Sequence, residues 1–523
     1  MQSYKKKTKL RYFGFFLYLC SVFFVSETKV LTMNICKNSQ AKIVATVGPA
    51  SRSEDMLTKL AEAGADVFRI NLSHDTHAIH AETVHKINAV RAKTGKNIII
   101  LGDLQGPKLR VGIMKDDGAM LENGQEFVLT AHECEGDNTQ AYMNYTELPS
   151  SVKAGDMVLI DDGKIKLEVL STNGKDKVTT KVINGGLLRS RKGVNLPDTQ
   201  VNLPCLTPKD LSDLEFAIEQ NLDWIGLSFV RKDSDIIELR NQINARNSHL
   251  KIVAKIEKPE ALQYLDEIIH KSDAIMVARG DLGVEVSFEK VPLIQKEIVA
   301  KCIAAAKPVI IATQMMESMI TNFSPTRAEA NDVANAVLEG ADAMMLSAET
   351  SMGEFPLEAV QAMQKIISWT ESKGLLQFPS HPPIDNGKRG HNYLTRSICY
   401  NAAALAKQVE AKGIVIFANS DIPVQLVASH RAAHAKIIAY TTKPELMRTL
   451  ALIWGVNVYL YPQFRTVAEA VCYAKKHILE NKLLEKGNKV VYVGSTPFTL
   501  DRSNMVRLGR MEINSSDEWT IEE

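Results

Sequence analysis

The chain has 523 residues, of which 45% are hydrophobic and 24% are charged, and its formal net charge is +1. This composition is ordinary for a globular protein, and the length predicts two to four domains. The balanced charge gives no reason to expect nucleic acid or a membrane surface as a partner. Seven single cysteines without a Cys-X-X-Cys pair argue against disulfides and structural zinc, and they predict a reducing compartment, the cytoplasm.

Residues 1–32 differ from the rest of the chain. A basic stretch, MQSYKKKTKLR, precedes an apolar stretch from Tyr12 to Val25, which is shorter than a membrane-spanning helix requires. This order is typical of a secretory signal. Two interpretations stay open: an export signal, or an over-extended start with Met33 as the natural first residue, which we favour.

A short apolar run followed by a helical stretch recurs along the chain. Near-continuous apolar strands that alternate with helices indicate a parallel sheet covered by helices. Eight such units predict a (β/α)8 barrel, although a long open sheet would also fit. The runs are 42–48, 66–73, 97–103, 223–230, 251–257, 273–279, 308–314 and 341–349.

The predicted barrel is interrupted once and is followed by another domain. Residues 112–197 alternate apolar and polar positions with Gly and Asp at turns, which predicts a small inserted β-barrel lid. The barrel thus comprises 33–111 and 198–375. A Pro- and Gly-bearing linker then leads to 390–523, where apolar runs again alternate with helical stretches and predict an open α/β domain.

Polar residues stand where the predicted barrel strands end. The carboxyl ends of barrel strands face the substrate, so these residues are candidates for a site. Because side chains alternate along a strand, Arg69, Asn71 and Ser73 share one face, as do Lys255 and Glu257. The other strand ends carry Asp103, Ser228, Arg279, Gly280, Asp281, Thr313, Ser347 and Glu349.

Each of these residues also has a structural interpretation. Lys255 and Glu257 could form a stabilising ion pair, and Asp281 could cap a helix. However, several independent strands turn ionic at the same end, and burying so much charge without a use is costly. Two acids, Glu257 and Asp281, suit Mg²⁺, while Arg69, Lys255 and Arg110 suit phosphate. The residues alone therefore predict a Mg²⁺-dependent barrel enzyme that handles phosphate.

Several long stretches, in order, resemble the pyruvate kinase family over about residues 36–510. They are TVGPAS (46–51), FRINLSH (68–74), KGVNLP (192–197), AKIE (254–257), MVARGDLGVE (276–285), ATQMMESM (312–319), PTRAEANDVANAV (325–337) and MLSAET (345–350). The family fold is a barrel with an inserted β lid and a C-terminal α/β domain, which is the fold predicted above. The resemblance further implies a homotetramer.

The resemblance implies transfer of a phosphoryl group from phosphoenolpyruvate to ADP, giving pyruvate and ATP. It implies that Glu257 and Asp281 hold Mg²⁺, that Lys255 neutralises charge on the moving phosphoryl group, and that Arg69 holds the phosphate. Such a mechanism relies on positioning and electrostatic stabilisation.

The resemblance also assigns the remaining substrate contacts. The backbone N–H groups of Gly280 and Asp281 would bind the substrate carboxylate beside Thr313. Thr313 would pass a proton to the enolate through water, with Ser347 and Glu349 as further members of that relay. The nucleotide would be contacted by Asn71, Ser73, His74, Arg110 and Lys192, the last reaching down from the lid.

One motif departs from the pattern of many relatives. Those relatives bind K⁺ through the equivalents of Asn71, Ser73 and Asp103 and through a threonine, in a motif that reads DTKGPEIR. Here the motif reads DLQGPKLR, so Leu104 replaces the threonine and Lys108 replaces a glutamate. We therefore expect K⁺ not to be required, with the Lys108 ammonium near the vacant K⁺ position as a surrogate cation.

Two alternative functions make different demands on the sequence. Another Mg²⁺-dependent phosphoenolpyruvate or oxoacid barrel enzyme would lack the lid and the C-terminal domain. A catalytically silent regulatory descendant would not need Arg69, Lys255, Glu257, Asp281 and Thr313 together, yet all of them are present.

Overall fold

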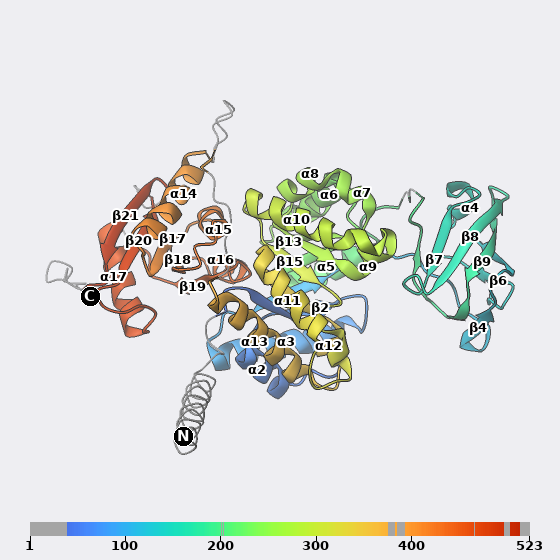
Figure 1. Ribbon diagram of the computed structural model, residues 1–523, viewed down its shortest axis with the longest axis horizontal. Helices are drawn as coiled ribbons and strands as arrows, with labels where there is room; N and C mark the ends of the chain where they lie inside the picture. The colour runs from blue at the N-terminus through green and yellow to red at the C-terminus, as the bar shows by residue number, and fades with distance from the viewer. Residues whose placement is uncertain are drawn as a thin grey trace, which may run out of the picture.

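The computed structural model describes residues 39–199, 201, 203–374, 382–383, 393–464, 466–495 and 503–512. Within this part, a central barrel lies between the C-terminal domain and the inserted β domain (Figure 1). The signal-like stretch at Tyr12–Val25 lies outside the described residues. Among the helices that the structure describes, none is long and apolar enough to span a bilayer.

Eight parallel strands close into the predicted barrel, in the order β1-β16-β15-β14-β13-β12-β3-β2. All eight apolar runs of the sequence form strands, so the open-sheet alternative is wrong. The strands are β1 (Lys42–Thr46), β2 (Ala65–Asn71), β3 (Ile99–Asp103), β12 (Trp224–Leu227), β13 (Lys251–Ile256), β14 (Ala274–Ala278), β15 (Val309–Ala312) and β16 (Ala343–Leu346).

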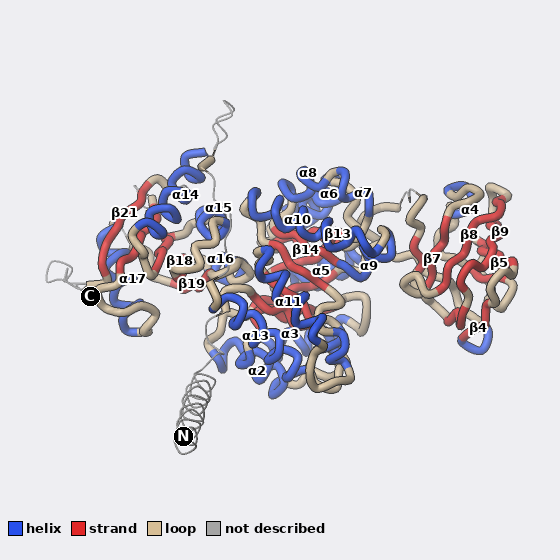
Figure 2. The backbone as a smooth tube through the Cα atoms, viewed as in Figure 1, coloured by secondary structure: helices blue, strands red, loops and turns tan. Residues whose placement is uncertain are grey.

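The strand side chains alternate between two apolar cores. On β1, Ile43 packs outward against helices, whereas Val44 belongs to the cluster inside the barrel. The strands therefore read as unbroken apolar runs, because both faces are buried. Figure 2 shows the strands enclosed by helices.

The helices of the barrel begin at recognisable caps. Thr207 and Thr326 each form a capping box with the acid three residues later, which starts α5 and α11. The barrel helices are α2 (Glu54–Ala63), α3 (His77–Thr94), α5 (Pro208–Glu219), α6 (Asp233–Ala245), α7 (Pro259–Gln263), α8 (Leu265–Lys271), α9 (Arg279–Glu285), α10 (Val291–Ala305), α11 (Arg327–Glu339), α12 (Ala348–Ser351) and α13 (Pro356–Ser372), with single turns at Phe288–Lys290 and Glu317–Ile320.

The insertion after β3 is a β domain, as predicted, with its own apolar core. Its strands form a six-stranded sheet, β11-β7-β8-β9-β5-β6, and a separate ribbon, β10-β4, so the expected small closed barrel is corrected to this arrangement. The elements are Lys115–Asp117, β4 (Gly118–Leu121), β5 (Glu126–Thr130), β6 (Gln140–Tyr142), α4 (Leu148–Ser151), β7 (Met157–Ile160), β8 (Ile165–Thr172), β9 (Lys177–Asn184), β10 (Gly186–Arg189) and β11 (Val194–Asn195).

The C-terminal domain is an open sheet in the order β19-β18-β17-β20-β21. The four parallel strands were predicted, whereas the antiparallel edge strand β21 was not, because it is largely exposed and carries no apolar run. The elements are α14 (Tyr393–Gln408), β17 (Gly413–Phe417), α15 (Ile422–Ser429), β18 (Lys436–Thr441), α16 (Pro444–Leu450), β19 (Val456–Leu460), α17 (Val467–Glu480), β20 (Lys489–Gly494) and β21 (Met505–Arg510).

Ion pairs join this domain to the amino-terminal end of the barrel. Arg431 donates to both carboxylate oxygens of Asp342, at 3.0 and 2.8 Å, and both side chains are almost fully buried. Lys251, at the start of β13, lies 2.7 Å from Asp421. The two domains are therefore fastened by charged contacts on the face of the barrel opposite the candidate site.

Candidate active site

Three charged side chains meet at the carboxyl ends of β2, β3 and β13. Arg69 donates to Oδ2 of Asp103 through Nε at 2.8 Å, and its terminal nitrogen lies 2.6 Å from the same oxygen. Arg69 also donates to the hydroxyl of Thr46, at the end of β1. Asp103 in turn lies 3.3 Å from the Lys255 ammonium. The predicted convergence of these strand ends is confirmed.

The Lys255 ammonium is held by three oxygens. It lies 2.8 Å from Oε1 of Glu257 and 3.3 Å from Oδ1 of Asp103, and it donates to the Ser228 hydroxyl at 2.7 Å. Burial opposes the charged form, but the two carboxylates outweigh it and raise the pKa of Lys255. The ammonium is therefore a fixed positive charge at this end of the barrel.

Glu257 is aimed by the backbone of the neighbouring strand. Its Oε2 accepts a hydrogen bond from the N–H of Phe229 at 2.8 Å, and Phe229 has a left-handed φ of 55° that points this donor at the acid. Burial raises the pKa of Glu257, and the charge of Asp281 raises it further. The partly exposed Asp281 therefore adds negative charge close to the buried Glu257, and a bound cation would offset that charge.

Thr313 occupies a strained turn directly after β15. Its φ is 66°, and that of Gln314 is 53°, which is unfavourable for a β-branched residue and costs about 1–3 kcal/mol. Arg279 holds this turn by donating to the carbonyls of Thr313 and Gln314 at 2.8 and 3.0 Å. The Thr313 hydroxyl accepts the N–H of Gly280 at 2.7 Å, so that backbone donor is already engaged.

The residues expected to continue a proton relay are buried nearby. Glu349 accepts the backbone N–H groups of Ser347 and Met316, at 2.7 and 3.2 Å. Burial raises the pKa of Glu349. Within the described chain, the buried Ser347 hydroxyl has no hydrogen-bond partner, and the Thr313 hydroxyl bonds to Gly280 and to the carbonyl of Ala312. No direct hydrogen bond therefore links Thr313 to Ser347 or Glu349.

Lys108 lies at a different acid from the one expected. Its ammonium is 3.7 Å from Oδ1 of Asp281, whereas both oxygens of Asp103 face Arg69 and Lys255. The expected position near Asp103 is thus corrected to one beside Asp281. Leu104 is buried, and its carbonyl accepts a hydrogen bond from Ser228 at 2.7 Å.

The predicted nucleotide residues fall into two groups. Asn71 ends β2, and Ser73 and His74 follow it in a turn, in which the Asn71 side chain accepts the N–H of Ser73 at 3.2 Å. Arg110 and Lys192 lie where the chain enters and leaves the inserted domain. In the described structure both are engaged within that domain: Arg110 donates to the carbonyl of Arg191 at 2.9 Å, and Lys192 lies 2.8 Å from Asp161.

Three supporting residues received no role from the sequence. Ser228 links Lys255 to the Leu104 backbone, Phe229 aims Glu257, and Arg279 fixes the turn at Thr313. Ser228 and Arg279 come directly after buried strands, and this position in the sequence could have marked them as supporting residues of the site. The left-handed backbone of Phe229 could not be predicted from the sequence, because phenylalanine rarely adopts a positive φ.

The fold and this cluster together define the class of protein: a (β/α)8 barrel enzyme with a charged site at the carboxyl ends of its strands. A family model, the pyruvate kinase barrel domain, matches residues 38–360, and the pyruvate kinase alpha/beta domain matches residues 396–508. The chain belongs to the pyruvate kinase family.

Individual relatives are similar along nearly their whole length. A pyruvate kinase of Mycobacterium intracellulare is 39% identical over 474 residues, which cover 90% of this chain and 98% of the relative. One from Agrobacterium vitis is 41% identical over 91% of this chain and 99% of the relative. A crystal structure of a pyruvate kinase from Cryptosporidium parvum superposes with a TM-score of 0.84 at 33% identity, covering 92% of this chain and 98% of that one.

Proposed function

We propose that this chain transfers the phosphoryl group of phosphoenolpyruvate to ADP, giving pyruvate and ATP. The observation that carries the proposal is the buried Lys255 ammonium, held between Asp103 and Glu257 and close to the Arg69 guanidinium. Phosphoryl transfer requires fixed positive charge around a group that remains strongly negative throughout. The family membership of the whole chain supports the same reaction.

Glu257 and Asp281 would hold Mg²⁺. The repulsion between their negative charges would be relieved by a cation. Among the described residues, no group of three His, Cys, Asp or Glu side chains could hold a metal ion. Mg²⁺ commonly takes one or two carboxylates and completes its shell with water and substrate oxygens, so two acids are sufficient. Bound there, the ion would polarise the substrate oxygens that it contacts.

Around that ion, the chain's own side chains would position the substrate. Arg69 would hold the phosphate through the edge of its guanidinium group that does not face Asp103. Lys255 would stabilise negative charge on the phosphoryl group and on the enolate. The backbone at Gly280 and Asp281 would receive the carboxylate, with the Gly280 N–H released from Thr313 or shared with it. Thr313 would deliver a proton through water, and Ser347 and Glu349 would connect to it only through further water.

The nucleotide would be bound between the barrel and the inserted domain. Asn71, Ser73 and His74 would contact it from the barrel, and Arg110 and Lys192 from the lid. Lys192 would leave Asp161 for the nucleotide phosphates as the lid closes. This exchange replaces a half-exposed ion pair, which is worth little, by contacts to a multiply charged phosphate.

K⁺ would not be required. The Lys108 ammonium supplies one positive charge beside Asp281, and Leu104 offers no oxygen ligand. Because this position differs from the one that the motif suggested, Lys108 would balance the acidic pair from the Asp281 side.

We further propose a homotetramer in the cytoplasm, which sedimentation analysis of the purified protein and fractionation of cells would test.

A coupled assay of the purified protein tests the proposed reaction directly. Phosphoenolpyruvate, ADP and Mg²⁺ should yield equal amounts of pyruvate and ATP, and omission of any one of them should stop the reaction. Absence of product with all three present would instead favour a catalytically silent relative. Pyruvate formation without ATP would point to a different phosphoenolpyruvate enzyme.

A further inference from the structure

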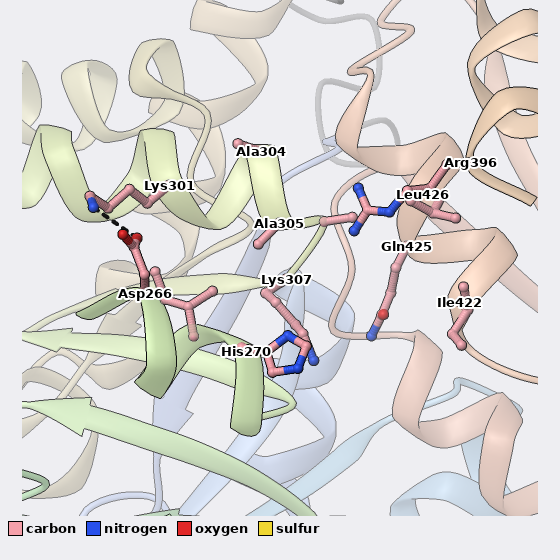
Figure 3. Close-up of a pocket in the computed structure, with 12 residues that line it drawn as sticks. Asp266, His270, Lys301, Ala304, Ala305, Lys307, Arg396, Ile422, Gln425 and Leu426 are labelled. Carbon is pink, nitrogen blue, oxygen red and sulfur yellow. Dashed lines mark hydrogen bonds and ion pairs between the residues drawn. The ribbon is translucent and has the colours of Figure 1, made fainter. Parts of the chain in front are cut away.

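A cavity of about 440 Å³ lies far from the candidate active site, between the barrel and the C-terminal domain. The barrel contributes the ends of α8 and α10 and the residues that follow α10, and the C-terminal domain contributes α14 and α15. Figure 3 shows the side chains of both domains that line it. Its volume falls within the range of small-molecule sites.

The lining combines an apolar wall with several cationic groups. Ile269, Ala305 and Leu426 are among the apolar residues. Lys307 and Arg396 also line the cavity, one from each domain, and Figure 3 shows the Arg396 guanidinium pointing from α14 toward the end of α10. A ligand here would meet apolar surface on one part and positive charge on another.

The positive charge in this cavity is only partly balanced. Lys301 is neutralised by Asp266 at 2.8 Å. By contrast, Arg396 forms no ion pair with any acid in the part of the chain that the structure describes. Lys307 donates to the carbonyl of Ser272 at 2.6 Å, so at most one of its three donor hydrogens is used there.

The acids nearest to Lys307 are committed to other cations. Asp421 lies 2.7 Å from Lys251, and Asp273 pairs with Arg240 and also faces Lys251. Burial lowers the pKa of Lys307, and the pull of these two acids does not reverse that effect. A bound anion would supply the missing counter-charge.

We propose that this cavity binds a small organic phosphate, with its phosphate between Lys307 and Arg396 and its apolar or planar body against Ile269, Ala305 and Leu426. Arg396 offers a planar fork and Lys307 a point charge, which together suit a phosphate dianion. The ligand would bridge the two domains beside the Lys251–Asp421 ion pair.

Binding can be measured without activity, so its failure is distinct from a failure of the proposed reaction. The probe is 1-naphthyl phosphate, titrated calorimetrically into the full-length protein, with 1-naphthol and inorganic phosphate as its two fragments. We expect one saturable site per chain and an affinity at least about tenfold above that of either fragment, because both halves of the cavity contribute. Absence of saturable binding at millimolar probe would overturn the proposal.

Variants locate the bound probe. Arg396→Gln should weaken binding by at least about tenfold through loss of a charge-assisted hydrogen bond. Since Arg396 has no ion-pair partner among the described residues, this variant should fold normally. Lys307→Met should have a similar effect. Lys407→Gln, an exposed change on the same helix, is the matched control and should bind as the wild type does.

Three results would contradict the proposal. If the probe binds equally well to Arg396→Gln and Lys307→Met, it occupies another site, such as the active site. If Lys407→Gln weakens binding as much as Arg396→Gln, the effect is non-specific charge. If either fragment binds as tightly as the whole probe, the cavity does not recognise an organic phosphate as such.

Discussion

Replacing Lys255 by Met should abolish phosphoryl transfer while leaving the chain folded. The side chain length is nearly kept, but the charge that contacts Asp103, Glu257 and Ser228 at 3.3, 2.8 and 2.7 Å is lost. Removal of one preorganised donor to transition-state charge typically costs about 3–4 kcal/mol, or about 100- to 1,000-fold in turnover. The coupled assay with saturating phosphoenolpyruvate and ADP measures this loss as kcat.

The same substitution breaks a buried ion pair, so stability must be measured beside activity. Such a break costs about 3–5 kcal/mol when the partner charge stays buried. The contact of Asp103 with Arg69 survives, and Glu257 can take up a proton, so a smaller loss is expected. Lys42→Met is the matched control: this buried lysine donates to the Val456 carbonyl at 3.1 Å, at the other end of the barrel. It should lower the melting temperature without lowering kcat. A Lys255→Met enzyme within tenfold of wild-type turnover would refute the assigned role.

Four further outcomes are expected. Activity in Na⁺ or tetramethylammonium should match that in K⁺, and Lys108→Glu combined with Leu104→Thr should create K⁺ dependence; a many-fold K⁺ activation of the wild type would contradict this. Glu257→Gln should raise the Mg²⁺ concentration for half-maximal activity by more than about tenfold, because one of two carboxylate ligands is lost; an unchanged Mg²⁺ titration would exclude it as a ligand. Burial raises the pKa of Glu371 from 4.5 to about 7, so its protonated form stabilises the fold below the pKa of the unfolded chain, and this contribution is lost as the pH rises through about 7. From about pH 5 to pH 8, the melting temperature of the wild type should therefore fall relative to that of Glu371→Gln, and parallel curves would rule this out. Arg431→Met should lower the unfolding free energy by about 3–5 kcal/mol in a urea titration, since a buried charge loses its partner; an unchanged midpoint would show that the domain junction does not depend on it.

The barrel could be predicted because each strand is buried on both faces. A run such as residues 308–314 is continuously apolar and then turns polar at its end, and both facts are visible in the sequence. The same logic placed Arg69, Lys255 and Glu257 together, because parallel strands present their carboxyl ends on one side. Periodicity and the parallel arrangement of strands thus determine where charge can gather.

What could not be predicted depends on backbone twist and on side-chain reach. The positive φ values of Phe229 and Thr313 arise from surrounding contacts, and both residue types normally avoid them. Lys108 has a long, flexible side chain, and the motif alone did not reveal that its ammonium lies beside Asp281. The alternating pattern of the insertion predicted a β domain, but it did not reveal that the strands form a six-stranded sheet and a separate ribbon rather than a closed barrel.

The insertion has a consequence for how the barrel forms. β3 and β12 are neighbours in the barrel, with Leu101 opposite Trp224, although more than a hundred residues separate them in the chain. Arg110 and Gly193 form an antiparallel bridge where that excursion begins and ends, and the excursion has its own apolar core. Once the inserted domain has folded, the chain between the two barrel strands behaves as a short loop, because loop-closure entropy depends on the length that remains flexible. The pairing of β3 with β12 is thereby converted into a nearly local one.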